Sequence, residues 1–328
     1  MTPADLSLTV LHAVRRAVDE GALRVDVPAR VKVERPRPGG VGDYASSIAL
    51  SLARPSGRPP LDVAGILKER LRDSPGIRAV DITGPGFLNF TLATGRGARL
   101  VREIGAAGLG YGYSDALAGT RVRLLGTDEP RARLVGEVVV RLLRSQGADA
   151  RAGGPDGGGG ERLHVLPAPH EPGLLGADAA RWALLRPAGH DHALPGGPLL
   201  VQHERNPLFR VRYAHSRARA LVRNGAQLGV PAVYEGESGE GDGDGLLALL
   251  ADHPALLLAA ARHRAPDRLA RQLEGVADAL LSFQHTVLPL GDEKPSAAHR
   301  SRLALAEAAG TVLAGGLSLL GISAPDQI

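Results

Sequence analysis

The chain has no cysteine, a single methionine and almost no lysine among its 328 residues. Without cysteine there is no disulfide, no thiolate nucleophile and no cysteine-ligated zinc or iron–sulfur site. No run of about 18 uncharged apolar residues occurs, so the sequence predicts no transmembrane helix and no membrane partner. The first residues lack the basic region of a secretory signal, and we therefore expect a cytoplasmic protein.

Basic charge is carried almost entirely by arginine. Lys32, Lys68 and Lys294 are the only lysines, which leaves 36 arginines among the 39 basic residues. Arginine suits bidentate phosphate contacts and stacking on bases, although a GC-rich genome produces the same bias without a functional cause. The 44% apolar content fits a folded protein. The net charge of +4 is compatible with nucleic-acid binding but does not demonstrate it.

Residues 1–113 are expected to form a small α+β domain. Apolar residues recur at helical spacing in three segments, and short alternating runs flank the turn Thr83–Gly86. Asp43 is interpreted as the cap of the second helix. The expected elements are helices at 2–21, 43–52 and 61–71 and strands at 31–34, 79–82 and 87–92.

Residues 114–205 are expected to form a reduced α/β unit that resembles the remnant of a Rossmann domain. Its strand is predicted at Arg121–Gly126 and its helix at Glu129–Ser145. The glycine-rich run 153–160 is interpreted as a loop, because Glu161-Arg162-Leu163 follows it where a phosphate-binding loop needs Gly-Lys-Ser/Thr. Residues 206–328 are expected to form an all-α bundle, since short Pro- or Gly-containing connections separate helices. These helices are predicted at 206–225, 246–251, 255–263, 266–283 and 296–320.

The helix around residues 208–223 combines an aromatic residue with positive charge. At 100° per residue, Tyr213 points away from the predicted core face. A ring surrounded by arginines is a common device for holding single-stranded RNA, by base stacking beside phosphate contacts. A solvated helix face with an incidental tyrosine explains the pattern equally well. The core face consists of Leu208, Val211, His215, Ala218 and Val222, and the arginines beside Tyr213 are Arg210, Arg212, Arg217, Arg219 and Arg223.

Other combinations of reactive residues predict no chemistry. His190, Asp191 and His192 lie in a glycine-rich loop whose i,i+2 spacing lacks the framework of a metal site. No Gly-x-Ser-x-Gly or Ser-x-x-Lys motif is present. We expect no metal, no cofactor and no catalytic residue.

Four motifs resemble the arginyl-tRNA synthetase family. Gly42-Asp43-Tyr44-Ala45 and Gly84-Pro85-Gly86-Phe87-Leu88-Asn89-Phe90 resemble its N-terminal add-on domain. Asn206-Pro207-Leu208-Phe209-Arg210-Val211-Arg212-Tyr213-Ala214-His215-Ser216-Arg217 is similar to the start of its DALR-type anticodon-binding domain, and Leu317-Ser318-Leu319-Leu320-Gly321-Ile322-Ser323-Ala324-Pro325 to its end. The motifs occur in the family's order and frame most of 1–113 and 206–328.

The two nucleotide signatures of that family are absent. Its His-x-Gly-His stretch would fall between Thr127 and Gly136, where no histidine stands. A Lys-Met-Ser-Lys loop has no counterpart, because Met1 is the sole methionine and no lysine occurs between Lys68 and Lys294. Adenylate formation needs stabilised charge at the phosphates, so the resemblance predicts a truncated paralogue with an eroded catalytic domain.

The resemblance implies an RNA-facing role for the two outer domains. Tyr44, Phe87 and Asn89 would mark the surface that meets the tRNA elbow, while Tyr213 and the arginines around it would meet the anticodon loop. The family's Phe-Tyr-Asn near the end of the bundle is replaced by Phe283-Gln284-His285. A base-stacking tyrosine is thereby lost, and the tRNA preference is expected to be relaxed or changed.

Three hypotheses follow. The first is a catalytically inactive protein that binds tRNA, with arginine tRNA as the first candidate. The second is an active arginine–tRNA ligase. The third is a protein-interaction module whose partner is a full-length synthetase or another protein.

Overall fold

The computed structural model describes residues 3–34, 36, 41–92, 96–153, 159–168, 175–234 and 243–328. These residues divide into two compact units, Met1–Leu100 and Val101–Ile328. Both units contain helices, and the sheets are small. The separation of the second unit into a middle domain and a helical domain stays a prediction.

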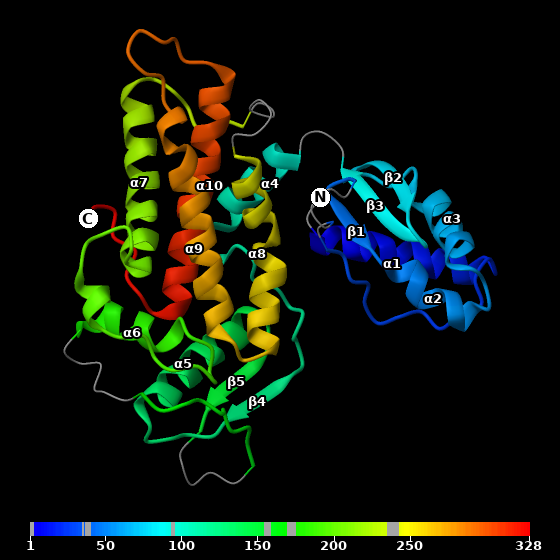
Figure 1. The fold of residues 1–328 in the computed structure, drawn as a ribbon, viewed down its shortest axis with the longest axis horizontal. Helices are drawn as coiled ribbons and strands as arrows, with labels where there is room; N and C mark the ends of the chain where they lie inside the picture. The colour runs from blue at the N-terminus through cyan, green and yellow to red at the C-terminus, as the bar shows by residue number, and fades with distance from the viewer. Residues whose placement is uncertain are drawn as a thin grey trace. The chain divides into compact units, whose positions relative to one another are not determined.

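The first unit is an α+β domain built on a three-stranded antiparallel sheet of order β1-β3-β2. Helices and strands share one apolar core that includes Leu6, Leu67, Leu88 and Phe90. Of the predicted helix–strand–helix–helix–strand–strand order, the strand at 31–34 was wrong, because only an isolated bridge between Glu34 and Ala45 forms there. The other predicted elements are present for most of their length. The elements are α1 (Pro3–Asp19), β1 (Tyr44–Ser46), α2 (Ile48–Ser56), α3 (Pro60–Leu71), β2 (Ile77–Thr83) and β3 (Phe87–Leu92) (Figure 1).

The segment after Gly42 begins as a strand, so the helix predicted from Asp43 was wrong at its start. Gly42 has φ +83°, and a Cβ there would lie 2.8 Å from the carbonyl oxygen of Phe90. The Asp43 carboxylate accepts a hydrogen bond from the amide of Leu92 at 2.8 Å. Both contacts hold the chain along β3, and α2 therefore begins only at Ile48.

In the second unit, the strand predicted at 121–126 and the helix predicted at 129–145 are both present, and a second strand that was not predicted follows the helix. β4 (Arg121–Leu124) and β5 (Asp149–Ala152) pair in parallel, and α5 (Pro130–Ser145) connects them. Most of the glycine-rich run 153–160 lies outside the described residues. The other helical elements are α4 (Arg96–Ala107), which crosses the division between the units, η1 (Gly108–Gly110), α6 (Ala177–Leu185), η3 (Gly197–Leu200), α7 (Pro207–Gln227), α8 (Asp244–Arg262), α9 (Pro266–Phe283), η4 (Gln284–Thr286) and α10 (Ala297–Leu320).

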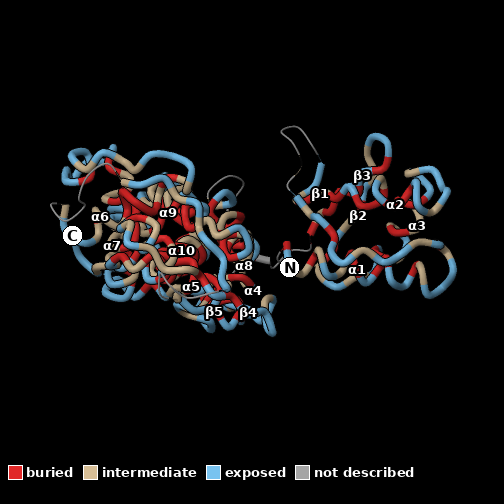
Figure 2. Tube along the Cα trace, turned by 90° about the horizontal axis from the view of Figure 1, so that it is seen from below, coloured by how far each residue is buried: buried red, intermediate tan, exposed pale blue. Residues whose placement is uncertain are grey.

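Helix α10 is the buried centre of the bundle that it forms with α7, α8 and α9 (Figures 1 and 2). Three glycines on α10 allow different neighbours to approach closely. A Cβ on Gly310 would lie 2.9 Å from the Ala218 Cβ of α7, and one on Gly316 would lie 2.5 Å from the Leu273 side chain of α9. A Cβ on Gly315 would lie 2.7 Å from the Leu109 carbonyl oxygen of η1.

Helix α8 is continuous, although two helices were predicted on either side of Pro254. The helix extends through this proline, which removes one amide donor without ending it. By length and composition alone, α8 and α10 could each cross a membrane, contrary to the sequence expectation. In the bundle, 78% of the apolar window of α10 and 50% of that of α8 are buried, as in core helices.

A buried polar network joins α8 to α9 and to the segment before β4. His253 stacks on Tyr111 with ring centroids 5.8 Å apart, and its Nδ1 lies 2.7 Å from Gln272 Oε1. The Gln272 amide nitrogen donates to the Leu249 carbonyl, so its oxygen faces the imidazole, which must donate from Nδ1. Burial lowers the pKa of His253, which is therefore neutral in the folded chain.

We expect the stability of the second unit to fall as pH drops below about 6.5, the usual pKa of an unfolded histidine. Below that value the unfolded chain binds a proton that buried His253 and His215, whose pKa burial also lowers, do not take up. Each pH unit then costs at most about 1.4 kcal/mol per histidine, until the folded pKa is reached. Urea unfolding between pH 8 and 5 measures this effect. His253→Gln keeps a donor for Gln272 and should flatten the profile, whereas an equally steep profile would contradict the assignment.

Candidate nucleic-acid interface

Helix α7 is fixed at its start by a buried asparagine cap. The Asn206 side-chain oxygen accepts from the amides of Leu208 and Phe209 at 3.0 and 3.2 Å, and Pro207 occupies the first turn. The Asn206 amide nitrogen donates to the carbonyls of Leu199 and Val201, both at 2.9 Å. This double anchoring fixes the start of α7 to the segment before it. Of the predicted core residues, Leu208, Val211, His215 and Ala218 are buried and Val222 is half-buried.

The exposed face of α7 presents two stacked rings. Phe209 and Tyr213 are one helical turn apart, with centroids 5.7 Å apart and an interplanar angle of 14°. Tyr213 is exposed, as predicted, and Phe209 supports it from the N-terminal side. Sequence reasoning missed Phe209, although its i,i+4 spacing from Tyr213 was a usable signal. The pair supplies a preformed aromatic surface on which a nucleobase could stack.

Several of the predicted arginines already have partners within the chain. Arg210 pairs with Asp278 of α9 at 2.6 Å, and Arg212 lies 3.7 Å from the Asp178 carboxylate of α6. Arg223 is exposed, and no partner is seen for it among the described residues. Fewer guanidinium groups of this face are therefore available to bind phosphate than the number of its arginines predicts.

Gln284, which the resemblance predicts to replace a tyrosine of the family, contacts α7. Its side-chain oxygen accepts from Arg217 Nε at 2.7 Å, and its amide nitrogen donates to the Leu281 carbonyl at 3.3 Å. The second bond fixes the orientation of the amide, so the Arg217 guanidinium is held beside the aromatic pair. A hydrogen-bonding group thus lies at this edge of the face.

A small pocket adjoins the aromatic pair at the start of α7. Its volume is about 320 Å³, and both Phe209 and Arg212 line it. Exposed Leu200 and Val201 of the preceding segment lie on another side, together with Ile328. The Asp178 carboxylate and other polar groups complete a mixed lining. Within it, the aromatic ring and the guanidinium suit an unstacked base with its phosphate.

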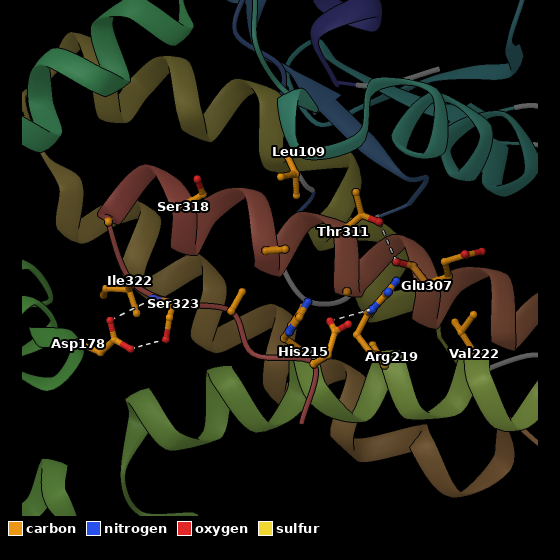
Figure 3. A pocket seen from close by; sticks show the side chains of 16 residues that line it. Leu109, Asp178, His215, Arg219, Val222, Glu307, Thr311, Ser318, Ile322 and Ser323 are labelled. Atoms are coloured by element: carbon orange, nitrogen blue, oxygen red, sulfur yellow. Dashed lines mark hydrogen bonds and ion pairs between the residues drawn. The ribbon is translucent and has the colours of Figure 1, made fainter. Parts of the chain in front are cut away.

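A second hollow of about 700 Å³ lies between α7, α10 and the last residues of the chain (Figure 3). His215 was predicted to be a structural core residue, and the structure buries it here, with Nδ1 3.0 Å from the Pro325 carbonyl. Asp178 on the other side accepts from both the amide and the hydroxyl of Ser323. The last residues are thereby fastened across the hollow.

The residues predicted to face the tRNA elbow do not share one surface. Phe87 is exposed, but Tyr44 and Asn89 are buried, so the prediction that they mark a surface was wrong in this respect. Tyr44 of β1 lies opposite Phe90 of the central strand β3. Asn89 is on β3 itself, between β1 and β2. The Asn89 amide donates to the Thr83 hydroxyl at 2.7 Å and stabilises the turn before Phe87.

The start of α5 is occupied by side chains of the chain itself. The Glu129 carboxylate accepts from the amides of Ala132 at 2.5 Å and Ala168 at 3.2 Å, where a helix N-terminus would otherwise favour a bound anion. Arg131 is fully buried, and burial lowers its pKa. All five of its N–H groups donate to backbone carbonyls, namely those of Leu166, Leu184, Pro187, Ala188 and Asp191.

The remaining sequence-level candidates add no chemistry. His190 lies 3.7 Å from Asp191. The part of the chain that the structure describes contains no group of three or more possible metal ligands. Most of the segment 167–173, which stands where the family's mobile catalytic loop would be, lies outside the described residues.

Comparison with known proteins identifies both ends of the chain. Residues 8–92 match the arginyl tRNA synthetase N terminal domain, and residues 211–328 match the DALR anticodon binding domain. The arginine–tRNA ligase of Micrococcus luteus is 44% identical over 167 residues, which are 46% of this chain and 30% of that protein. The ligase of Frankia alni is 43% identical over 45% of this chain and 28% of its own length. Such alignments span less than a third of those relatives.

Other comparisons extend along the whole chain. The arginine–tRNA ligase of Paenarthrobacter aurescens is 24% identical and both proteins are fully covered. Thermus thermophilus arginyl-tRNA synthetase shares the fold with a TM-score of 0.72 at 14% identity, covering 100% of both chains. These relatives are named as ligases, so the expectation that this chain is not an enzyme gains no support from them. The chain carries the N-terminal domain and the DALR anticodon-binding domain of the arginyl-tRNA synthetase family.

Proposed function

We propose that this chain binds tRNA through the exposed face of α7. The observation that carries the proposal is the stacked pair Phe209–Tyr213, which spans the start of the DALR match at residue 211 and lies beside Arg217 and a pocket. Stacking on a ring does not depend on base identity, while guanidinium groups supply phosphate contacts. A helix face that is only in contact with solvent does not require two stacked rings next to a pocket.

Tyr213→Ala should weaken tRNA binding by about 1–3 kcal/mol, because one base loses its stacking partner. Filter binding with unfractionated tRNA at low salt measures the change. Tyr113→Ala removes another exposed tyrosine outside α7 and serves as the matched control. Equal affinities of the two variants would contradict the assignment, as would wild-type binding that does not weaken with added salt.

Arginine–tRNA ligase activity is the second candidate. It is favoured by the names of relatives aligned along the full chain. The residues of the chain support our proposal that it binds tRNA without forming an adenylate. No lysine lies between Lys68 and Lys294, and the alignment with the Paenarthrobacter ligase runs over 549 positions against 328 residues here. Glu129 and Arg131 also fill the start of α5, where a nucleotide phosphate would need free donors.

Arginine-dependent exchange of pyrophosphate into ATP decides between the two candidates. Background exchange by the purified chain supports binding without catalysis. Arginine-dependent exchange that stays with the chain at constant specific activity through repurification would establish the ligase.

The identity of the RNA and of any protein partner follows from co-purification. The Arg217–Gln284 pair stands where the family has a ring, so we propose a changed or relaxed tRNA preference, with arginine tRNA as the first candidate. Sequencing of bound RNA tests this preference. A full-length synthetase or another protein that stays bound after nuclease treatment, with no RNA present, would favour the interaction-module hypothesis.

A further inference from the structure

Beside the aromatic pair, a second row of side chains on α7 consists of arginines and a serine, which are residue types that contact RNA phosphates. Arg212, Ser216, Arg219 and Arg223 are spaced four, three and four residues apart, which places them on a single face. The stripe spans about 16 Å along the helix axis. It lies next to the aromatic pair, so a strand whose base stacks on Tyr213 could continue along it.

The last residues of the chain cover the middle of this stripe. We call Ser323–Asp326 the strap. The Asp326 carboxylate pairs with Arg219 at 3.1 Å (Figure 3). The backbone carbonyl of Asp326 accepts from the Ser216 hydroxyl at 3.2 Å. The other end of the strap is held by Asp178, whose carboxylate also lies 3.7 Å from Arg212. Two of the three arginines of the stripe thus lie near a carboxylate, Arg219 near Asp326 and Arg212 near Asp178.

The contact between the strap and the stripe is replaceable. The side chains of Asp326 and Arg219 are 59% and 49% exposed, and such ion pairs contribute little to stability. A phosphodiester oxygen offers the guanidinium an equivalent charged acceptor. Only the Asp326 carboxylate has to leave Arg219, because the bond between buried His215 of α7 and the Pro325 carbonyl is a separate contact of the strap backbone.

We propose that the Ser216–Arg219–Arg223 edge of α7 is a further contact surface for the sugar–phosphate backbone of RNA, and that Asp326 occupies the phosphate position until RNA displaces it. This inference rests on the proposed tRNA binding. It assigns the strap a role as an internal competitor that sets the affinity of the surface.

Asp326→Asn should lower the Kd for unfractionated tRNA roughly threefold to fivefold, because the competing charge is removed while the shape is kept. Arg219→Gln should raise the Kd, and adding Asp326→Asn to it should change nothing further, since the arginine for which the two anions compete is gone. Asp292→Asn removes another exposed negative charge outside the strap and should change the Kd by less than about 1.5-fold.

A gain for Asp326→Asn that equals that of Asp292→Asn, or that persists fully in the Arg219→Gln background, overturns the proposal and leaves tRNA binding intact. If the wild-type chain and all variants fail to bind tRNA even at low salt, the proposed function fails, and the role of the strap fails with it. Thermal unfolding of each variant verifies that the comparison is made between folded proteins.

Discussion

Arg131→Met should destabilise the second unit by about 3–5 kcal/mol. The substitution fills a similar volume but removes every hydrogen-bond donor from a fully buried site. Five backbone carbonyls between Leu166 and Asp191 then lose their partners, and buried acceptors without donors are costly. Trp182, the only tryptophan, is buried in α6 two residues before the Leu184 carbonyl that Arg131 contacts. Its fluorescence during urea unfolding is therefore a direct readout.

Arg133→Met is the matched control for this effect. Arg133 lies two residues away on the same helix and is exposed, so its loss should change stability by less than about 0.5 kcal/mol. Arg131→Lys should fall between the two, because an ammonium has three donors and cannot span five carbonyls. Equal unfolding midpoints for Arg131→Met and Arg133→Met would refute the structural role.

The role of Arg131 bears on what the middle region does. A guanidinium whose donors are all engaged by the chain's own carbonyls has none left for a phosphate. The Glu129 carboxylate adds negative charge at the same helix start. In this region Arg131 therefore holds together the segments that connect α5, α6 and α7. The exchange assay decides whether the chain activates arginine.

Local sequence patterns predicted the elements of the candidate site well. Pro130–Ser145 and Pro207–Gln227 agree with the helices expected at 129–145 and 206–225, because apolar residues recur at helical spacing and Asn206-Pro207 is a recognisable helix start. The outward direction of Tyr213 followed from the same periodicity. Such features depend only on residues within a few helical turns.

The electrostatics of the site could not be predicted in this way. Arg210 pairs with Asp278, Arg217 with Gln284 and Arg219 with Asp326, and these partners lie far apart in sequence. Nothing local indicates which carboxylate reaches α7. The burial of Asn89 has a similar origin, since it results from the position of β3 between β1 and β2.

Gly315→Ala should destabilise the bundle by about 1–3 kcal/mol, against the intrinsic preference of helices for alanine. The added Cβ would lie 2.7 Å from the Leu109 carbonyl oxygen and 3.4 Å from its carbon. Both belong to the backbone of η1, which cannot rotate away as a side chain can. The clash therefore outweighs the roughly 1 kcal/mol that alanine gains over glycine within a helix.

Gly275→Ala, in the same bundle, should change the stability in the opposite direction. Its Cβ would lie 3.7 Å from the Leu249 side chain, an ordinary contact, so only the helix preference remains and stability should rise by about 0.5–1 kcal/mol. Chemical unfolding of both variants under the same conditions gives the comparison. If both alanines stabilise the protein, η1 does not pack against α10 as closely as the structure shows, because the identical substitution can change sign only through the contact at Leu109.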